Sequence, residues 1–415
     1  MKRFFLYIII LYSALAMVGC SDNGVVDPDD DKPKPRQEME RTVIVYIAGQ
    51  NSLSDAISGD LSEMEKAKAD IPANVNFIVY VDDYHNPAIY EISAKDGKKL
   101  WKQYDTQRCS TDSLTMLETL REIERFFPAR HYGITFWSHA SGWTPQEPRT
   151  RSFGQDPAIT DPQSPKRTQE MDIPVLAGVL ANLPRFDYIF FDACFMQCIE
   201  VAYELRHATK WMIGSPAEIP GPGAPYDKIV SPLCHANVEG IVNGYSSVYP
   251  LEVKNSYGQT TAYYSGVLLS CIDCEEMDNM ADVTRRLLVP HYMGRVSLPF
   301  SGLQAYADDK HNPQLKSFPH FFDMRTTMFN QLTDSEYAEW MGAFLKAVPL
   351  RTYSSTRTWL ADFCYNAVIL DPEHYGGVSM FIPNSYYETY SARNWNLDAH
   401  QASWYNACGW ADTGW

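Results

Sequence analysis

The sequence predicts an α/β protein built around a mainly parallel β-sheet. Two kinds of segment support this fold class. Uninterrupted runs of β-branched and aromatic residues, as at 42–48 and 76–81, are typical of strands buried on both faces. Between such runs, apolar residues recur at helical spacing, as at 116–127. Alternating strands and helices imply right-handed crossovers and a sheet whose strands run parallel.

The elements of this sheet follow in order along the chain. Buried strands are predicted at residues 42–48, 76–81, 132–137, 187–191 and 210–214. Amphipathic helices are predicted between them, around Leu61 and Met64, at 116–127 and at 176–183. Because parallel strands end at the same edge of a sheet, we expect functional side chains at their carboxyl ends.

The length of the chain indicates more than one packed part. About 370 residues follow residue 41, which exceeds a usual single core. We divide them into a first domain at 42–253 and a companion domain at 254–415, packed on the sheet. The companion domain begins with a strand-like run at 261–270 and a polar helix at 275–288.

The amino-terminal segment has the features of a bacterial lipoprotein signal. Residues 1–20 comprise a basic start, an apolar run at 4–18 and a small residue before Cys20, which is similar to an acylation site. An ordinary signal peptide cut nearby is the alternative. Residues 21–41 are polar and acidic, and we expect a disordered tether there. A lipid on Cys20 would anchor the protein in the cell envelope, in the periplasm or exposed on the outer membrane.

The composition indicates a globular protein and excludes some partners. Hydrophobic residues make up 45% and aromatic residues 13% of the chain, enough to form a core. The formal net charge of −16 argues against binding to nucleic acid or to an anionic membrane surface. The same charge is weakly favourable for basic substrates. We expect a monomer.

The number and spacing of the cysteines predict neither a disulfide framework nor a metal site. There are nine, of which Cys20 is assigned to the lipid. Cys271 and Cys274 form a lone C-x-x-C pair without a second half, so zinc is not expected. His291, His311, His320 and His374 also lack metal-ligand spacing. No metal ligands and no required cofactor are therefore predicted.

Two predicted strands end at residues capable of nucleophilic catalysis. His139 follows the third strand and Cys194 follows the fourth. If these strands are neighbours, both side chains face one crevice, where an imidazole can take the proton of a thiol. The segment after Cys194 is predicted to be a helix whose N-terminus would lower the pKa of the thiol. The alternative is a structural Cys and an unrelated His.

The residues around this pair fit the same chemistry. Ala140, Ser141 and Gly142 are small, so their backbone N–H groups can approach a substrate. The N–H groups of Ala140 and Cys194 could together hold a developing oxyanion. Cys198, one helical turn further on, is expected to lie against the core and to be inert.

The amino-acid sequence of these segments resembles that of the clostripain family of cysteine peptidases. The resemblance is carried by W-S-H-A-S-G-W at 137–143, F-D-A-C-F-M at 191–196 and I-E-V-A-Y-E-L at 199–205, and continues at 215–219, 365–366 and 376–383. It implies a caspase-like sheet, with Cys194 and His139 as the catalytic pair. Two positions depart from the family pattern: Ala140 replaces a usual Gly and Phe195 a usual Leu. Ala140 restricts the backbone available to an oxyanion donor.

The resemblance also implies a substrate preference. The family's matching Asp selects Arg or Lys before the cut, and this role falls on Asp192, two residues before Cys194 and on the same side of the strand. The alternative is a structural Asp that caps the following helix. Glu218 and Asp227 are further, weaker pocket candidates. Polypeptides with Arg or Lys before the cut are the expected substrates.

Self-cleavage and calcium dependence are expected only from the resemblance. The segment at 144–170 is polar and rich in Pro, and Lys166-Arg167 is the first choice for self-cleavage. An uncut surface insertion is the alternative. No contiguous calcium loop is present in the sequence. Two other functions remain open: a caspase-fold lipoprotein that binds peptides or glycans without catalysis, and a peptidase that cuts after Asn or Asp.

Overall fold

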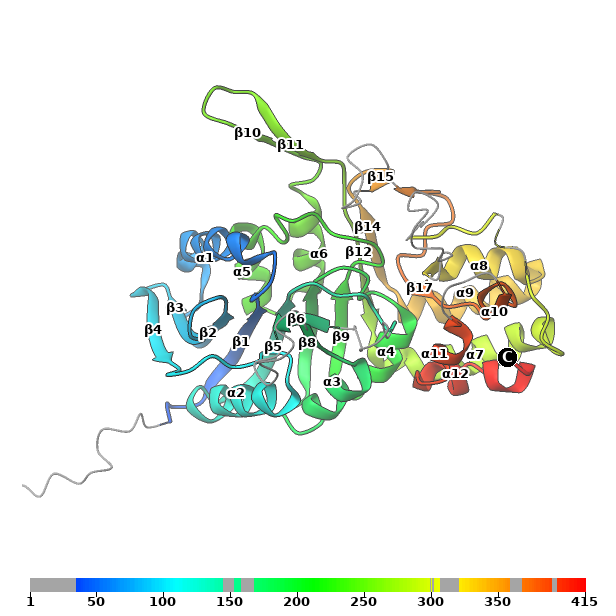
Figure 1. The fold of residues 1–415 in the computed structure, drawn as a ribbon, viewed down its shortest axis with the longest axis horizontal. Helices are drawn as coiled ribbons and strands as arrows, with labels where there is room; N and C mark the ends of the chain where they lie inside the picture. Colours follow the sequence, from blue (N-terminus) through cyan, green and yellow to red (C-terminus); the bar gives the residue numbers. More distant parts are fainter. Residues whose placement is uncertain are drawn as a thin grey trace, which may run out of the picture. The chain divides into compact units, whose positions relative to one another are not determined.

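A nine-stranded sheet forms the centre of the fold in the computed structural model. The structure describes residues 35–144, 153–157, 168–298, 300, 302–306, 321–358, 368–389 and 394–415. The strand order is β14-β12-β9-β8-β5-β1-β2-β3-β4. The inner strands are parallel and comprise β2 (Val75–Asp82), β1 (Met39–Ala48), β5 (Ala129–Trp137), β8 (Phe186–Asp192) and β9 (Thr209–Gly214). Figure 1 shows this sheet at the centre of the fold.

Antiparallel strands extend the sheet at both edges. On one side β3 (Ala88–Ser93) and β4 (Gly97–Gln103) follow β2. On the other side β12 (Leu268–Asp273) pairs with β9, and β14 (Leu350–Tyr353) pairs with β12. The described residues also form short pairs outside the sheet, made by β6 (Phe153–Pro157), β7 (Thr168–Met171), β10 (Leu251–Lys254), β11 (Thr260–Tyr264), β13 (Phe322–Asp323), β15 (Arg357–Thr358), β16 (Val368–Ile369) and β17 (Ser379–Met380).

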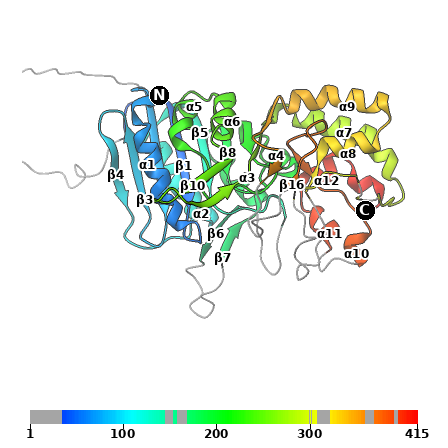
Figure 2. The ribbon, with the colours of Figure 1, turned by 90° about the horizontal axis from the view of Figure 1, so that it is seen from above.

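Helices cover both faces of the sheet. The described α-helices are α1 (Ile57–Lys66), α2 (Ser113–Phe126), α3 (Ile173–Leu180), α4 (Ile199–Leu205), α5 (Tyr226–Cys234), α6 (Val238–Ser246), α7 (Met277–Tyr292), α8 (Met324–Gln331), α9 (Asp334–Ala347), α10 (Tyr386–Thr389), α11 (Trp395–Ala399) and α12 (Ser403–Ala407). Single 3-10 turns are found at η1 (Ser54–Ala56), η2 (Lys68–Asp70), η3 (Cys274–Glu276) and η5 (Trp410–Thr413). Figure 2 shows α7, α8 and α9 beyond the sheet on the side away from β4.

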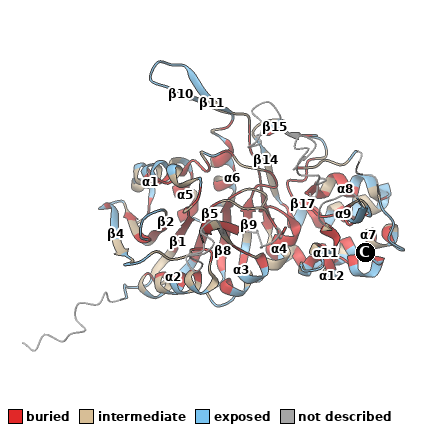
Figure 3. Cartoon of the chain, viewed as in Figure 1, coloured by how far each residue is buried: buried red, intermediate tan, exposed pale blue. Residues whose placement is uncertain are grey.

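The alternation of side chains along the central strand produces two cores. Ile44 and Tyr46 of β1 belong to a cluster that includes α2, α3 and α4, whereas Val43 and Val45 belong to a cluster with α1, α5 and α6. Successive residues of a strand point to opposite faces, so a continuous apolar run supplies both cores. Figure 3 shows the sheet buried and the outer sides of the helices exposed.

The five strands predicted from the sequence are all present in the sheet. The β3–β4 hairpin was not predicted, and β1 begins at Met39, inside the segment predicted as tether. The run predicted as one strand at 261–270 is wrong, because β11 ends at Tyr264 and β12 starts at Leu268. An added Cβ at Gly266, between them, would lie 2.7 Å from Ser355, so the backbone passes too close for an ordinary strand residue.

Residues 254–415 contribute to the sheet itself as well as packing beside it. Strands β12 and β14 come from this segment, and Pro35 to Trp415 form one compact unit. The proposed division at residue 253 stays a prediction. All the cysteines described are unpaired thiols: Cys109, Cys194, Cys198, Cys234, Cys271, Cys274 and Cys408. Within the described residues, none of the helices combines the length and apolar character needed to cross a membrane.

A close contact between β5 and β8 gives a prediction about stability. Gly133 of β5 is paired with Tyr188 of β8, and an added Cβ would lie 2.3 Å from the Tyr188 ring. That ring is buried, and its hydroxyl donates to the Leu233 carbonyl at 3.0 Å, so it has little freedom to move. We expect Gly133→Ala to lower the free energy of unfolding by about 1–3 kcal/mol in denaturant titrations.

Gly178→Ala is the matched control for this substitution. Gly178 lies in α3 with nothing near its absent Cβ, so an alanine there has room. Alanine favours a helix more than glycine does, and we expect a gain of about 0.5–1 kcal/mol. Equal effects of the two substitutions would contradict the steric explanation for Gly133.

Candidate active site

The register of two neighbouring strands, β5 and β8, brings the predicted site residues together. Trp137 at the end of β5 is paired with Asp192 at the end of β8, and His139 and Cys194 each follow that pair by two residues. The side chains of His139, Cys194 and Asp192 line one cavity of about 220 Å³. The sequence therefore located this site at the correct edge of the sheet, since parallel strands share their carboxyl ends.

The Cys194 thiol is half-buried in this cavity. The backbone N–H of Ile219 donates to its Sγ at 3.4 Å. Burial raises the pKa of the Cys194 thiol to about 12, and the carboxylates of Glu218 and Asp192 raise it further, against the lowering effect of the Ile219 N–H. The thiol is therefore neutral at physiological pH in this structure.

The prediction that a helix begins directly after Cys194 is wrong. Helix α4 begins only at Ile199. Phe195 has a φ of 60°, in the left-handed region, and its N–H donates to the Ala217 carbonyl. Residues 195–198 therefore pair with neighbouring segments instead of forming a helical turn. The predicted lowering of the thiol pKa by a helix N-terminus is corrected accordingly.

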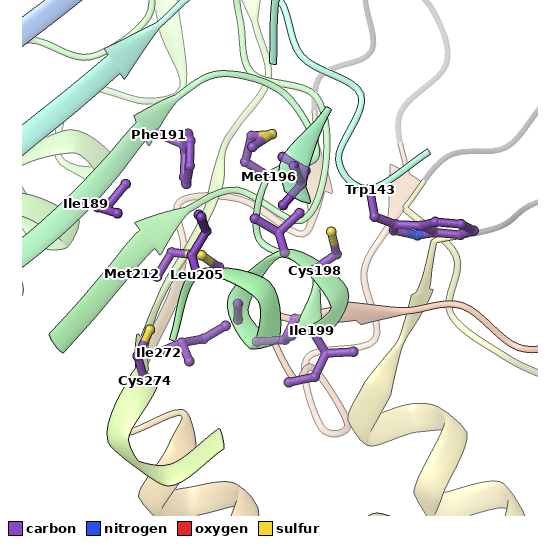
Figure 4. Close-up of a cluster of buried hydrophobic side chains, with 14 of the residues drawn as sticks. Trp143, Ile189, Phe191, Met196, Cys198, Ile199, Leu205, Met212, Ile272 and Cys274 are labelled. Atoms are coloured by element: carbon purple, nitrogen blue, oxygen red, sulfur yellow. The ribbon is translucent and has the colours of Figure 1, made fainter. Parts of the chain in front are cut away.

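Cys198 lies where it was predicted, against the core. It is fully buried in the apolar cluster that includes Met196 and Ile199 (Figure 4). Burial raises the pKa of its thiol well above the usual value, which makes ionisation unfavourable. Cys198 is an internal comparison for Cys194, because the two thiols differ in access to the cavity.

His139 is half-buried, and the loop that follows the first strand, β1, contacts its side chain. Its Nε2 lies 2.8 Å from the hydroxyl Oγ of Ser52, and its carbonyl accepts from the N–H of Gly154. Ser52 belongs to the loop after β1, which is held by Asn51, whose side-chain amide donates to the carbonyls of Ala48 and Gln155. Neither Ser52 nor Asn51 was predicted, although β1 ends at the same edge.

Asp192 is a buried carboxylate with three donors. The N–H of Ala224 and the Tyr226 hydroxyl donate to its Oδ2 at 3.1 and 3.2 Å, and the Tyr245 hydroxyl donates to Oδ1 at 3.1 Å. Burial nevertheless raises the pKa of Asp192 to about 6, with these hydrogen bonds opposing the rise. Above pH 6 the carboxylate of Asp192 therefore gives the cavity an anionic wall. The three donors to Asp192 lie outside the following helix, α4, so Asp192 does not cap that helix.

The loop that covers Asp192 requires a glycine. Gly223 has a φ of 65°, and an added Cβ would lie 3.1 Å from Asp192 Oδ2. Its carbonyl accepts from the Tyr249 hydroxyl at 2.8 Å. Gly223, Tyr226 and Tyr245 were missed by sequence reasoning, because they lie more than thirty residues after Asp192, on helices α5 and α6 and the loop before α5.

A second buried carboxyl lies close to Asp192. Asp60 of α1 is 4% exposed, and burial together with the charges of Asp192 and Glu63 raises its pKa to about 9. Asp60 is therefore neutral at pH 7. Asp192 is left as the charged carboxylate of this pair.

The remaining predicted residues are placed as follows. Glu218 and Ala140 line the cavity. Asp227 lies in the first turn of α5, where it pairs with Lys228 at 3.0 Å, and it is not among the described lining residues. Lys166, Arg167 and Cys20 lie outside the described residues.

Metal ligands are not gathered at this site. No group of three His, Cys, Asp or Glu side chains in the described part of the chain is arranged to hold a metal ion. The calcium expectation rests on the resemblance alone and stays a prediction.

A thiol and an imidazole at the carboxyl ends of adjacent parallel strands, beside a buried carboxylate, are the arrangement typical of a caspase-like cysteine hydrolase. The profile of the Clostripain family matches residues 45–412, and the chain therefore belongs to the clostripain family of cysteine endopeptidases. This confirms the resemblance and the fold class predicted from the sequence.

Individual relatives agree with this assignment. Clostripain of Hathewaya histolytica is 24% identical over 231 residues, which cover 48% of this chain and 43% of clostripain, so the match spans less than half of that relative. A secreted C11 cysteine protease from Bacteroides thetaiotaomicron, solved with an irreversible peptide inhibitor, is 29% identical with a TM-score of 0.74. An inactive zymogen C11 protease from Parabacteroides distasonis is 25% identical with a TM-score of 0.71. Both structural matches cover 90% of this chain and 99% of the other.

Proposed function

We propose that this chain cuts polypeptides after Arg or Lys, with Cys194 as nucleophile and His139 as general base. The observation that carries the proposal is the single cavity lined by Cys194, His139 and Asp192. A nucleophile, a base and a charge that selects the substrate are the groups that this reaction needs in one place.

The state of the thiol determines how the reaction begins. Because the pKa of the Cys194 thiol is raised to about 12, a preformed thiolate is not the starting species. His139 takes the thiol proton as Sγ attacks the scissile carbonyl, and then gives it to the leaving amine. Water hydrolyses the resulting thioester, with His139 again acting as base.

The developing negative charge needs donors beside the thiol. We assign this role to the backbone N–H groups of Ala140 and Cys194, because both residues line the cavity. Each such donor is worth about 3 kcal/mol of transition-state stabilisation in other hydrolases.

The preference for a basic residue rests on Asp192. A desolvated carboxylate pairs with a guanidinium through two hydrogen bonds, or with an ammonium as a point charge. Glu218 adds a second negative charge at the cavity, and neutral Asp60 adds none at pH 7. A substrate with Asp at this position would be repelled, which disfavours cleavage after acidic residues.

Two further parts of the proposal concern processing and location. The chain is proposed to mature by cutting itself between His139 and Cys194, at Lys166-Arg167. It is also proposed to be held in the cell envelope by a lipid on Cys20. The proposal of self-cleavage is supported by the family and by the basic residues of the segment, and the proposal of a lipid anchor is supported by the sequence around Cys20.

A panel of fluorogenic peptides that differ only in the residue before the cut tests the proposed specificity. We expect kcat/KM for Arg or Lys to exceed that for Asn, Asp or a neutral residue by about 10²-fold or more, because a buried charge pair is worth several kcal/mol. Preferred turnover of the Asn or Asp peptide would remove the role of Asp192. A lack of turnover of every peptide would favour the alternative of a binding protein without catalysis.

A further inference from the structure

The loop at 217–224 contacts both the thiol of Cys194 and the carboxylate of Asp192. The backbone N–H of Ile219 donates to Cys194 Sγ at 3.4 Å, and the N–H of Ala224 donates to Asp192 Oδ2 at 3.1 Å. Ile219 also lines the cavity that contains Cys194. A peptide N–H of this loop therefore touches the atom that acts as nucleophile in the proposed reaction.

The position of the Ile219 N–H is fixed by hydrogen bonds on both sides. Before it, Ala217 is fully buried, and its carbonyl accepts from the Phe195 N–H at 3.0 Å. After it, the carbonyl of Gly223 accepts from the Tyr249 hydroxyl at 2.8 Å. A donor that is already held in place needs no reorganisation when negative charge develops beside it, so its full effect is available to the reaction.

Negative charge is difficult to develop on this sulfur. Burial is the largest cause of the raised pKa of the Cys194 thiol, and the carboxylates of Glu218 and Asp192 raise that pKa further. Helix α4 begins only at Ile199, so a helix N-terminus does not offset these effects. The Ile219 N–H is the largest influence that lowers the pKa, and it outweighs either carboxylate.

The contact with Ile219 favours the charged sulfur over the neutral one. A neutral S–H can donate to the Ile219 carbonyl, but Sγ lies 4.0 Å from that oxygen. The N–H lies closer, at 3.4 Å, and hydrogen bonds to a charged acceptor are about twice as strong as those to a neutral acceptor. The N–H therefore stabilises most strongly the state in which the proton has left the sulfur and the bond to carbon is incomplete.

We propose that the backbone N–H of Ile219 is a catalytic donor that stabilises negative charge on Cys194 Sγ while His139 removes the thiol proton. The proton moves from sulfur to the imidazole, and the electron pair left on sulfur forms the bond to the scissile carbonyl carbon. The Ile219 proton stays on its nitrogen throughout. The catalytic meaning of this donor rests on the proposed peptidase function, whereas its effect on the thiol is measurable without a substrate.

Alkylation of Cys194 by iodoacetamide tests the donor, because the thiolate is the form that reacts. Ile219→Pro removes the N–H, and Ile219→Ala is the matched control that shortens the side chain and keeps the N–H. The second-order rate constant is followed between pH 7 and 9 by mass analysis of the peptide that carries Cys194. We expect Ile219→Pro to lower it by about tenfold or more, and Ile219→Ala to change it by less than about twofold.

A backbone ester provides the same test without the ring of proline. Incorporating the α-hydroxy acid analogue of isoleucine at position 219 replaces the N–H by an oxygen and keeps the side chain. We expect the same loss of about tenfold in the alkylation rate. An ester at Gly221, an exposed position in the same loop, makes the same chemical change two residues away and should leave the rate unchanged.

Peptide turnover by the same variants separates this proposal from the proposed function. We expect kcat for an Arg peptide to fall with the alkylation rate while KM changes by less than about twofold, because the donor contacts the sulfur and not Asp192. Equal alkylation of wild-type protein and the 219 ester, or equal slowing by the 219 and 221 esters, would overturn the donor. Slower alkylation of the 219 ester in a protein that cleaves none of the peptides would support the donor and remove the peptidase function.

Discussion

Replacing Cys194 with Ala is expected to lower kcat/KM for an Arg peptide by about 10⁴-fold or more, because covalent catalysis then has no nucleophile. Residual turnover from substrate binding and oxyanion stabilisation would be near the limit of detection. The same substitution should abolish self-cleavage. Intact-mass measurement should therefore show one uncut chain for Cys194→Ala and two fragments for the wild type.

Cys198→Ala is the matched control for this substitution. It removes a thiol four residues away that lies fully in the apolar core. We expect kcat/KM to change by less than about threefold, while the free energy of unfolding falls by about 1 kcal/mol because a small cavity is left. Equal turnover by wild-type and Cys194→Ala protein would exclude Cys194 as the nucleophile. Fragments in both preparations would assign the cut to a foreign protease.

The edge of the sheet that carries the site could be predicted because periodicity is a local signal. A continuous apolar run is recognisable without its neighbours, and the alternation with helices fixes the strands as parallel. Once β5 and β8 are adjacent and paired at Trp137 and Asp192, His139 and Cys194 must emerge together. Two short segments thus defined most of the site.

The conformation after Cys194 could not be predicted, because it is set by contacts distant in sequence. Residues 195–198 read as the start of a helix, yet Ala217, Ser215 and Ser379 take their backbone hydrogen bonds. The loop instead places Phe195 in the left-handed region and stacks its ring on Phe321. Local propensity is a weak prior wherever a segment has partners from elsewhere in the chain.

The groups that support the site were missed for a related reason. Ser52 and Asn51 follow the first strand, and their importance depends on β1 lying directly beside β5. Tyr226 and Tyr245 bind Asp192 from two different helices, and nothing in the spacing of those helices announces a shared acceptor. The pattern of strands predicts which residues lie at the strand ends. The hydrogen-bond partners of those residues can be identified only in the packed structure.

Asp192→Asn should lower kcat/KM for Arg and Lys peptides by about 10²–10³-fold, because removing one partner of a buried charge pair costs about 2–5 kcal/mol. Asn preserves the shape of Asp, so Tyr226, Tyr245 and Ala224 can largely keep their positions. Peptides with a neutral residue before the cut should lose far less. Initial rates on a paired set of Arg and neutral peptides measure the difference.

Asp227→Asn is the control of equal charge, since Asp227 pairs with Lys228 outside the described lining of the cavity. It should change kcat/KM for the Arg peptide by less than about twofold. Protonation provides an independent check: burial raises the pKa of Asp192 to about 6, so the carboxylate, and with it the affinity for Arg peptides, is lost as pH falls through 6. In Asp192→Asn protein the ratio of Arg to neutral turnover should no longer change across that range. A ratio that still falls below pH 6 would place the selecting charge on another carboxylate, with Glu218 the next to replace.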